Sequence, residues 1–103
     1  FSAAEVWEAR HDSLVHAAGL VITRQRPGSA NGFIFVTLED ETGHINLIVW
    51  ERIADRQRRI LVESRLLGVW GRVQRDGDVL HVIAGRLEDH SAMLGGLTAG
   101  SLD

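Results

Sequence analysis

The amino-acid sequence predicts an all-β protein, a small closed barrel of five strands with one internal helix. Two adjacent segments alternate aliphatic with polar or aromatic residues at a period of two, which is typical of strands. A glycine interrupts a long β-rich run, which indicates a bulge or bend in a strand. Inside the domain, apolar residues recur at helical spacing in one segment, which predicts one helix. The chain has 103 residues and 45% hydrophobic content, enough for one packed core. We therefore expect a single domain.

The expected elements follow one another as three strands, a helix and two strands. The strands are expected at 14–25, 33–39, 44–50, 64–75 and 79–87, and the internal helix at 51–61. Pro27 and Gly28 signal a turn in the first loop. The residues 40–43 form a hairpin turn in which Gly43 is placed for a positive φ.

The two ends of the chain differ from this central part. Ser2 and Glu5 have capping-box spacing, which predicts a short N-terminal helix. The organisation we expect is an N-terminal helical lead-in over 1–13, the barrel over 14–89, and a flexible or loosely packed tail over 90–103. No stretch approaches the roughly 18 apolar residues of a membrane helix, and the start does not resemble a signal peptide. These features predict a cytoplasmic, monomeric domain without a membrane partner.

The order of elements matches the five-stranded Greek-key barrel called the OB-fold. A bulge or bend at Gly19 would let the first strand serve both halves of the barrel, which removes exposed sheet edges. A small SH3-like barrel is the competing fold. It gives no reason for a helix of about three turns between the third and fourth strands.

Composition excludes several kinds of site. Cysteine is absent, which removes disulfides, thiolate nucleophiles and cysteine-based zinc sites. The five histidines show no HxH, HxxxH or HExxH spacing, so we expect no metal site and no cofactor. The acidic residues Glu39, Asp40 and Glu41 could suggest a metal-dependent nuclease, but turn chemistry explains them more simply. Because no nucleophile with a base is recognisable either, we predict a non-catalytic module.

The net charge of −3 argues mildly against nucleic acid, but the charge is unevenly distributed. Residues 13–87 hold ten arginines against eight acids, whereas both ends are acidic. All basic residues are arginine, which suits bidentate phosphate contacts, although a GC-biased genome is the preferred explanation of this usage. The arginine-rich segment 52–59 is typical of a solvated helix face and could also steer an acidic partner.

The alternation in the second and third strands places aromatic residues on the outer face. The aliphatic set of each strand predicts the core, which leaves Phe33, Phe35 and Trp50 on the same face as Asn46. OB-folds bind oligonucleotides across these two strands and their flanking loops, and exposed aromatics there stack on bases. Asn46 would add a polar contact.

Arginines in the flanking loops complete the predicted site. We expect Arg24 and Arg26 in the loop before the second strand, with Arg72 and Arg75 near the loop before the fifth. Guanidinium groups at these places would contact phosphates on either side of the stacked bases.

A packing role is the alternative for each aromatic residue. A bulge could turn the phenylalanines inward, or the helix or the N-terminal segment could cover them. We favour packing for Phe33 and Trp50, and base stacking for Phe35. Trp70 could pack under the tail, and its role stays open.

The segment GFIFVTLEDETGHINLIVW resembles the OB domain of C-family bacterial DNA polymerases. With RQRPGSA before it and RLLGVWGRVQRDGDVLHVIAGRLED after it, residues 14–89 are most similar to the error-prone, translesion branch of that family, the paralogues of the polymerase III α subunit. The pattern F-x-x-L-E-D-x-T-G is shared in outline with anticodon-binding domains of synthetases, whereas RQRPGSA followed by this pattern is more specific.

This resemblance implies a C-terminal domain that contacts single-stranded template in a DNA-directed DNA polymerase. Such a polymerase acts in damage tolerance and induced mutagenesis, with an inactive Y-family polymerase and the sliding clamp as partners. Phe35 matches the stacking aromatic of synthetase OB domains, and Asn46 matches their polar position in the third strand. Glu39 stands where those domains carry arginine.

Three functions are therefore open. The first is a module that binds single-stranded DNA, which Phe35 and the loop arginines favour. The second is a protein-interaction module that docks a mutasome partner, which the net charge of −3 and the absence of lysine favour. The third is an anticodon-binding domain, which Glu39 disfavours.

Overall fold

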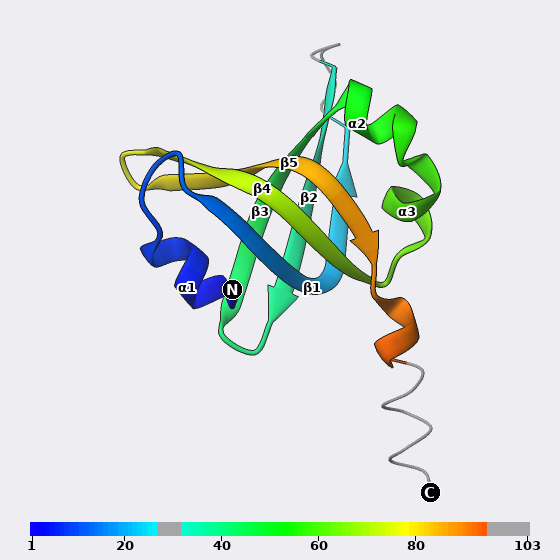
Figure 1. The fold of residues 1–103 in the computed structure, drawn as a ribbon, viewed down its shortest axis with the longest axis horizontal. Coiled ribbons are helices and arrows are strands. Elements are labelled where there is room, and N and C mark those ends of the chain that lie inside the picture. The colour runs from blue at the N-terminus through cyan, green and yellow to red at the C-terminus, as the bar shows by residue number, and fades with distance from the viewer. Residues whose placement is uncertain (27–31, 95–103) are drawn as a thin grey trace, which may run out of the picture.

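The computed structural model describes residues 1–26 and 32–94, which form a closed barrel of five strands (Figure 1). The strands pair in the order β1-β2-β3-β5-β4, and β3 and β5 run parallel while every other pair is antiparallel. Their bounds are β1 Leu14–Gln25, β2 Phe33–Asp40, β3 Gly43–Trp50, β4 Leu66–Asp76 and β5 Val79–Asp89. The helices are α1 Ala3–Glu8, α2 Glu51–Arg56 and α3 Arg58–Glu63. The predicted all-β barrel, with helix between the third and fourth strands, is confirmed.

Strand β1 closes the barrel by pairing with two partners. It pairs with β4 from Leu14 to Leu20 and with β2 from Leu20 to Gln25. A Cβ on Gly19 would lie 2.9 Å from the backbone oxygen of Glu39, so glycine permits the close approach of β2 at the change of partner. The bulge itself lies a little further along, between Val21 and Thr23. One bent strand therefore serves both halves of the barrel, as predicted.

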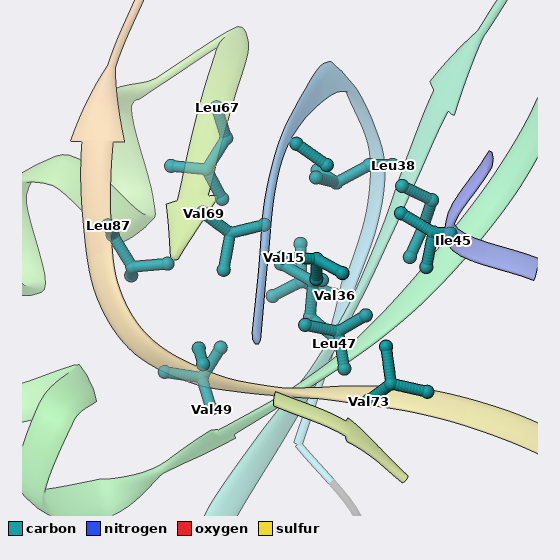
Figure 2. Packing of buried hydrophobic residues seen from close by; sticks show 14 of the residues in the cluster. Val15, Val36, Leu38, Ile45, Leu47, Val49, Leu67, Val69, Val73 and Leu87 are labelled. Carbon is teal, nitrogen blue, oxygen red and sulfur yellow. The ribbon is translucent and has the colours of Figure 1, made fainter. Parts of the chain in front are cut away.

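The predicted aliphatic face is the core. Figure 2 shows the inward side chains of β2 and β3 meeting those of β4 and β5 inside the barrel. The buried residues from the hairpin are Val36, Leu38, Ile45, Leu47 and Val49. Helix α1 contributes Ala3 and Val6 to this core, and α2 and α3 contribute Ile53, Ala54 and Leu61. Figure 1 shows α1 and the α2–α3 pair at well-separated places around the barrel.

The turn between β2 and β3 is organised by Asp40. Its Oδ1 accepts hydrogen bonds from the backbone nitrogens of Thr42 (2.7 Å) and Gly43 (3.1 Å), and Gly43 has the predicted positive φ of 150°. Its Oδ2 accepts one from the nitrogen of Ala3 (2.7 Å), in the first turn of α1. Desolvation would raise the pKa of Asp40, but bonds from Thr42, Ala3 and Gly43 outweigh it and leave the pKa below 3.8. Asp40 is therefore a turn residue.

The internal helix is broken, which the single predicted helix over 51–61 did not anticipate. Helices α2 and α3 are separated at Gln57, whose φ of −116° and ψ of 36° are not helical. The side chain of Gln57 donates to the oxygen of Leu87 and accepts from its nitrogen, both at 2.8 Å. This pair of bonds to β5 holds Gln57 away from ideal helical geometry.

The residues after β5 are fixed as far as they are described. The hydroxyl oxygen of Ser91 accepts from the nitrogens of Arg65 (2.8 Å) and Leu66 (3.3 Å). Most of the predicted loose tail, residues 95–103, lies outside the described residues, as does the predicted turn at Pro27 and Gly28. Within the described part, no helix is long and apolar enough to cross a membrane.

Candidate nucleic-acid interface

Four ring side chains from three strands form a continuous patch outside the barrel, which we call the aromatic face: Phe33, Phe35, Trp50 and His81. Phe33 lies edge to face against Phe35 and Trp50, with ring centroids 5.0 and 5.2 Å apart. The ring of Phe35 lies 5.8 Å from that of His81 and is tilted by 31°. The rings thus support one another and offer apolar surface on the outside of β2, β3 and β5.

Regular strand pairing holds these rings on the outer face. Strands β2 and β3 pair without a register shift from Phe33 opposite Trp50 to Asp40 opposite Gly43. A bulge that turns the phenylalanines inward is therefore not the arrangement found. Trp50 is 44% exposed, and the two phenylalanines are half-buried.

The polar side chains of the hairpin continue the same outer surface toward the turn. Thr37 donates a hydrogen bond to Oδ1 of Asn46 across the strands at 3.0 Å. Beyond them, Nε2 of His44 lies 3.1 Å from a carboxylate oxygen of Glu39. The surface changes from aromatic to acidic along the hairpin, so a polyanion would bind most favourably over its aromatic end.

The structure places Arg24 away from this surface. Arg24 belongs to β1 and not to the loop in which we expected it, and it pairs with the buried Val36. Its guanidinium donates to the oxygen of Leu61 at 2.6 Å and to that of Ser64, at the end of α3. Arg24 therefore satisfies carbonyl groups at a helix C-terminus, where a cation also favours the helix dipole.

Arg72 and Arg75 are also engaged with backbone oxygens. Arg72 donates to the oxygen of Asp12 at 3.0 Å, and Arg75 donates to the oxygens of Trp7 and Ala9. These bonds attach the N-terminal segment to β4. Arg72 is nevertheless exposed, and Arg26 is exposed at the end of β1, close to the aromatic end of the hairpin.

A family model described as an OB-fold nucleic acid binding domain matches residues 15–89, which is most of the chain and includes all five strands except Leu14, the first residue of β1. The chain belongs to this OB-fold family. Its aromatic face occupies the strand pair over which OB-folds receive oligonucleotides.

The relatives found by sequence agree with the resemblance seen in the motifs. The chain is 56% identical over 102 residues to a protein named error-prone DNA polymerase from Alkalilimnicola ehrlichii, with 99% of the chain and 10% of that protein covered. It is 57% identical over 91 residues to one of the same name from Azoarcus sp., with 88% of the chain and 9% of that protein covered. The chain thus spans about a tenth of the length of these curated relatives.

A solved structure supports the OB-fold independently of these names. Asparaginyl-tRNA synthetase from Pyrococcus horikoshii superposes with a TM-score of 0.70 and 24% identity, and the match covers 85% of this chain and 22% of that one. At this level of identity the likeness concerns the fold alone.

The sequence analysis missed His81 as a member of the aromatic face. Strand β5 pairs in parallel with β3, at Leu47 with Val82 and at Ile48 with Ile83. This pairing brings β5 beside the β2–β3 hairpin. The alternation of polar and aliphatic residues in β5 marks His81 as outward-facing, since Leu80 and Val82 are buried. Alternation alone does not tell which strand lies next to β5, so the contact with Phe35 was not predictable from local pattern.

Proposed function

We propose that this OB-fold domain binds single-stranded DNA across the aromatic face, as a template-contacting module of an error-prone DNA polymerase. The single observation that carries the proposal is the outward cluster of Phe33, Phe35 and Trp50 on the hairpin. Each base stacked on such a ring contributes about 1–3 kcal/mol, with little dependence on sequence.

The names of the relatives support DNA as the ligand. On this proposal, the domain is a non-catalytic part of a longer bacterial, cytoplasmic polymerase that acts in translesion synthesis and damage-induced mutagenesis. An inactive Y-family polymerase and the sliding clamp would be partners of the whole protein. Among the four arginines predicted to contact phosphate, Arg26 and Arg72 support the proposal best, because both are exposed. Arg26 follows Gln25, which pairs with Phe35 of the hairpin, and Arg72 pairs with Ile83 of β5.

Matched tryptophan substitutions test where DNA binds. Trp50 and Trp70 are exposed to nearly the same extent, 44% and 47%, but only Trp50 belongs to the aromatic face. We expect Trp50→Leu and Phe35→Ala each to weaken binding about 5-fold to 100-fold, the equivalent of one lost stack, while Trp70→Leu leaves it unchanged. The measurement is fluorescence anisotropy of a labelled single-stranded oligonucleotide titrated with the chain.

Salt dependence and arginine substitutions complete the test. Each phosphate contact contributes about 0.7 to the slope of log affinity against log salt, so Arg26→Ala should make the slope shallower. Arg86→Ala is the control, because Arg86 is exposed and pairs with Trp70, outside the aromatic face. If the folded chain binds no oligonucleotide even at low salt, the proposal fails, and the alternative of a surface that docks a mutasome partner becomes the function to pursue.

A further inference from the structure

A second cluster of side chains lies outside the barrel, on β1 and at the end of β5, and contains two histidines and a carboxylate. We call His16, Glu88 and His90 the histidine cluster. Nε2 of His16 lies 3.3 Å from Oε1 of Glu88, and Nε2 of His90 lies 3.1 Å from the same oxygen. The three donor atoms all lie within 4.8 Å of one another, and all three residues are half-buried. Residues 72 positions apart in the chain thus converge on one point.

The two imidazoles are held in place by their surroundings. The ring of His16 is stacked on that of Trp70, with centroids 3.8 Å apart and planes within 6°. The backbone nitrogen of His90 donates to the oxygen of Leu66 at 2.9 Å. Its ring lies over Gly68, where an added Cβ would be only 2.8 Å from Nε2. Because the ring occupies the space of a missing side chain, glycine at position 68 is required for this arrangement.

The spacing of the donor atoms fits a tetrahedral metal site. Zinc lies about 2.0–2.1 Å from histidine nitrogen and about 2.0–2.2 Å from carboxylate oxygen, which places neighbouring donor atoms about 3.3–3.5 Å apart. The two measured distances to the shared oxygen of Glu88 are close to this value.

We propose that His16, Glu88 and His90 bind a zinc ion through Nε2 of each imidazole and a carboxylate oxygen. Two imidazoles and one carboxylate suit zinc, and three protein ligands leave a fourth position for water. The ion would join β1 to the end of β5 across β4, where β1 and β4 pair from Leu14 to Leu20. This inference is independent of DNA binding, because none of the three ligands belongs to the aromatic face.

Calorimetric titration of the 103-residue chain with zinc alone is the first test. We expect one equivalent of zinc to bind. Loss of a residue that only hydrogen-bonds to a metal ligand typically lowers metal affinity 10-fold to 100-fold. His16→Gln and His90→Gln each remove a ligand itself, so each should lower the zinc affinity by more than this. His44→Gln is the matched control. The pair of His44 with Glu39 has the same 3.1 Å separation, but within the described residues it is not joined by a third ligand. Its substitution should leave the affinity unchanged.

A glycine substitution tests the geometry without removing a ligand. Gly68→Ala keeps all three donors but displaces the ring of His90, so zinc affinity should fall while the far-ultraviolet circular dichroism stays that of a folded barrel. Zinc should also raise the melting temperature of the unmodified chain and not that of Glu88→Gln, because an ion that binds only the folded state stabilises it. Absence of stoichiometric binding, or affinity unaltered in His16→Gln and His90→Gln, would overturn the proposal and leave a hydrogen-bonded cluster without metal.

Discussion

One half-exposed tryptophan belongs to the aromatic face and another packs against the histidine cluster, yet the two surfaces have different chemistry. Trp50 contacts Phe33 edge to face, and its surroundings are apolar rings. Trp70 is stacked flat on His16, next to the carboxylate of Glu88. Equal exposure of the same residue type therefore says little about function. The cross-strand neighbour decides whether a tryptophan offers a stacking surface to a ligand or fixes the orientation of an imidazole.

The largest expected effect comes from a glycine between the two surfaces. A Cβ on Gly71 would lie 2.6 Å from the backbone oxygen of Ile83 and 2.6 Å from a methyl group of Val82. Overpacking against backbone forces strands apart, so Gly71→Ala should lower the free energy of unfolding by about 3 kcal/mol. Chemical denaturation measures this. Gly85→Ala, whose Cβ would meet its nearest atom at 3.4 Å, should change it by less than about 0.5 kcal/mol.

Gly71 and Gly68 should affect the two surfaces differently. Gly71 pairs with Val15 of β1 and Ala84 of β5, so strain there should disturb both surfaces, whereas Gly68→Ala should affect only the histidine cluster. Equal stability of Gly71→Ala and the unmodified chain would show that β4 and β5 separate more easily than their close contact indicates.

The next effect concerns the turn that supports the aromatic face. Asp40→Ala removes the acceptor for the nitrogens of Ala3, Thr42 and Gly43, and should cost about 1–2 kcal/mol of folding free energy at neutral pH. Denaturant unfolding checks it. Glu41→Ala, at the exposed neighbouring position of the same turn, is the control.

The same carboxylate predicts a dependence on pH. Because the folded pKa of Asp40 lies below its ordinary value of 3.8, its contribution is present above that value and is lost as pH falls through the folded pKa. The difference in unfolding free energy between the unmodified chain and Asp40→Ala should therefore shrink below about pH 4. A difference that stays constant down to pH 2 would contradict this assignment.

A smaller effect separates the two tryptophan environments by double-mutant cycles. Edge-to-face aromatic pairs contribute about 0.5–1.5 kcal/mol beyond burial, so Phe33→Leu and Trp50→Leu should be coupled by that amount. The parallel cycle of His16→Leu with Trp70→Leu measures the coupling of the stacked pair beside the histidine cluster. A coupling near zero between Phe33 and Trp50 would show that the rings of the aromatic face do not support one another.

The smallest effect is expected for the exposed pair of His44 with Glu39. Both side chains are about half exposed, and such pairs contribute little in water. His44→Gln should change the free energy of unfolding by less than about 0.5 kcal/mol, measured by the same denaturant method. A loss above 1 kcal/mol would mean that this pair supports the hairpin more strongly than its exposure allows.

The sequence predicted the parts of the molecule that depend on neighbours close in the chain. The hairpin, its turn at Asp40 and Gly43, and the inward set of Val36 and Leu47 all follow from period-two alternation and turn chemistry. The resemblance to error-prone polymerases rested on this stretch together with RQRPGSA before it and the segment after it. Local pattern therefore sufficed for the fold and for the outward position of the aromatic residues, although we had favoured packing for Phe33 and Trp50. Contact of these rings with a ligand stays a prediction.

The sequence did not predict contacts between distant elements. Arg24 binds the end of α3, and Arg75 binds the N-terminal segment, although both were expected at phosphates. His16 meets His90 only because β1 and β5 flank β4 in the closed barrel. Spacing rules for metal ligands search within one element, so they detect at most Glu88 and His90 and cannot add His16 from a strand distant in the sequence.

The pair of hydrogen bonds from Gln57 to Leu87 has a consequence for association between molecules. The nitrogen and oxygen of Leu87 that bond to Gln57 point away from β4, as the backbone groups of an unpaired strand edge do. Exposed edges of this kind are templates for pairing with another chain. By occupying both groups with one amide side chain, Gln57 takes the place of a neighbouring strand. It thereby protects this end of the barrel against edge-to-edge aggregation.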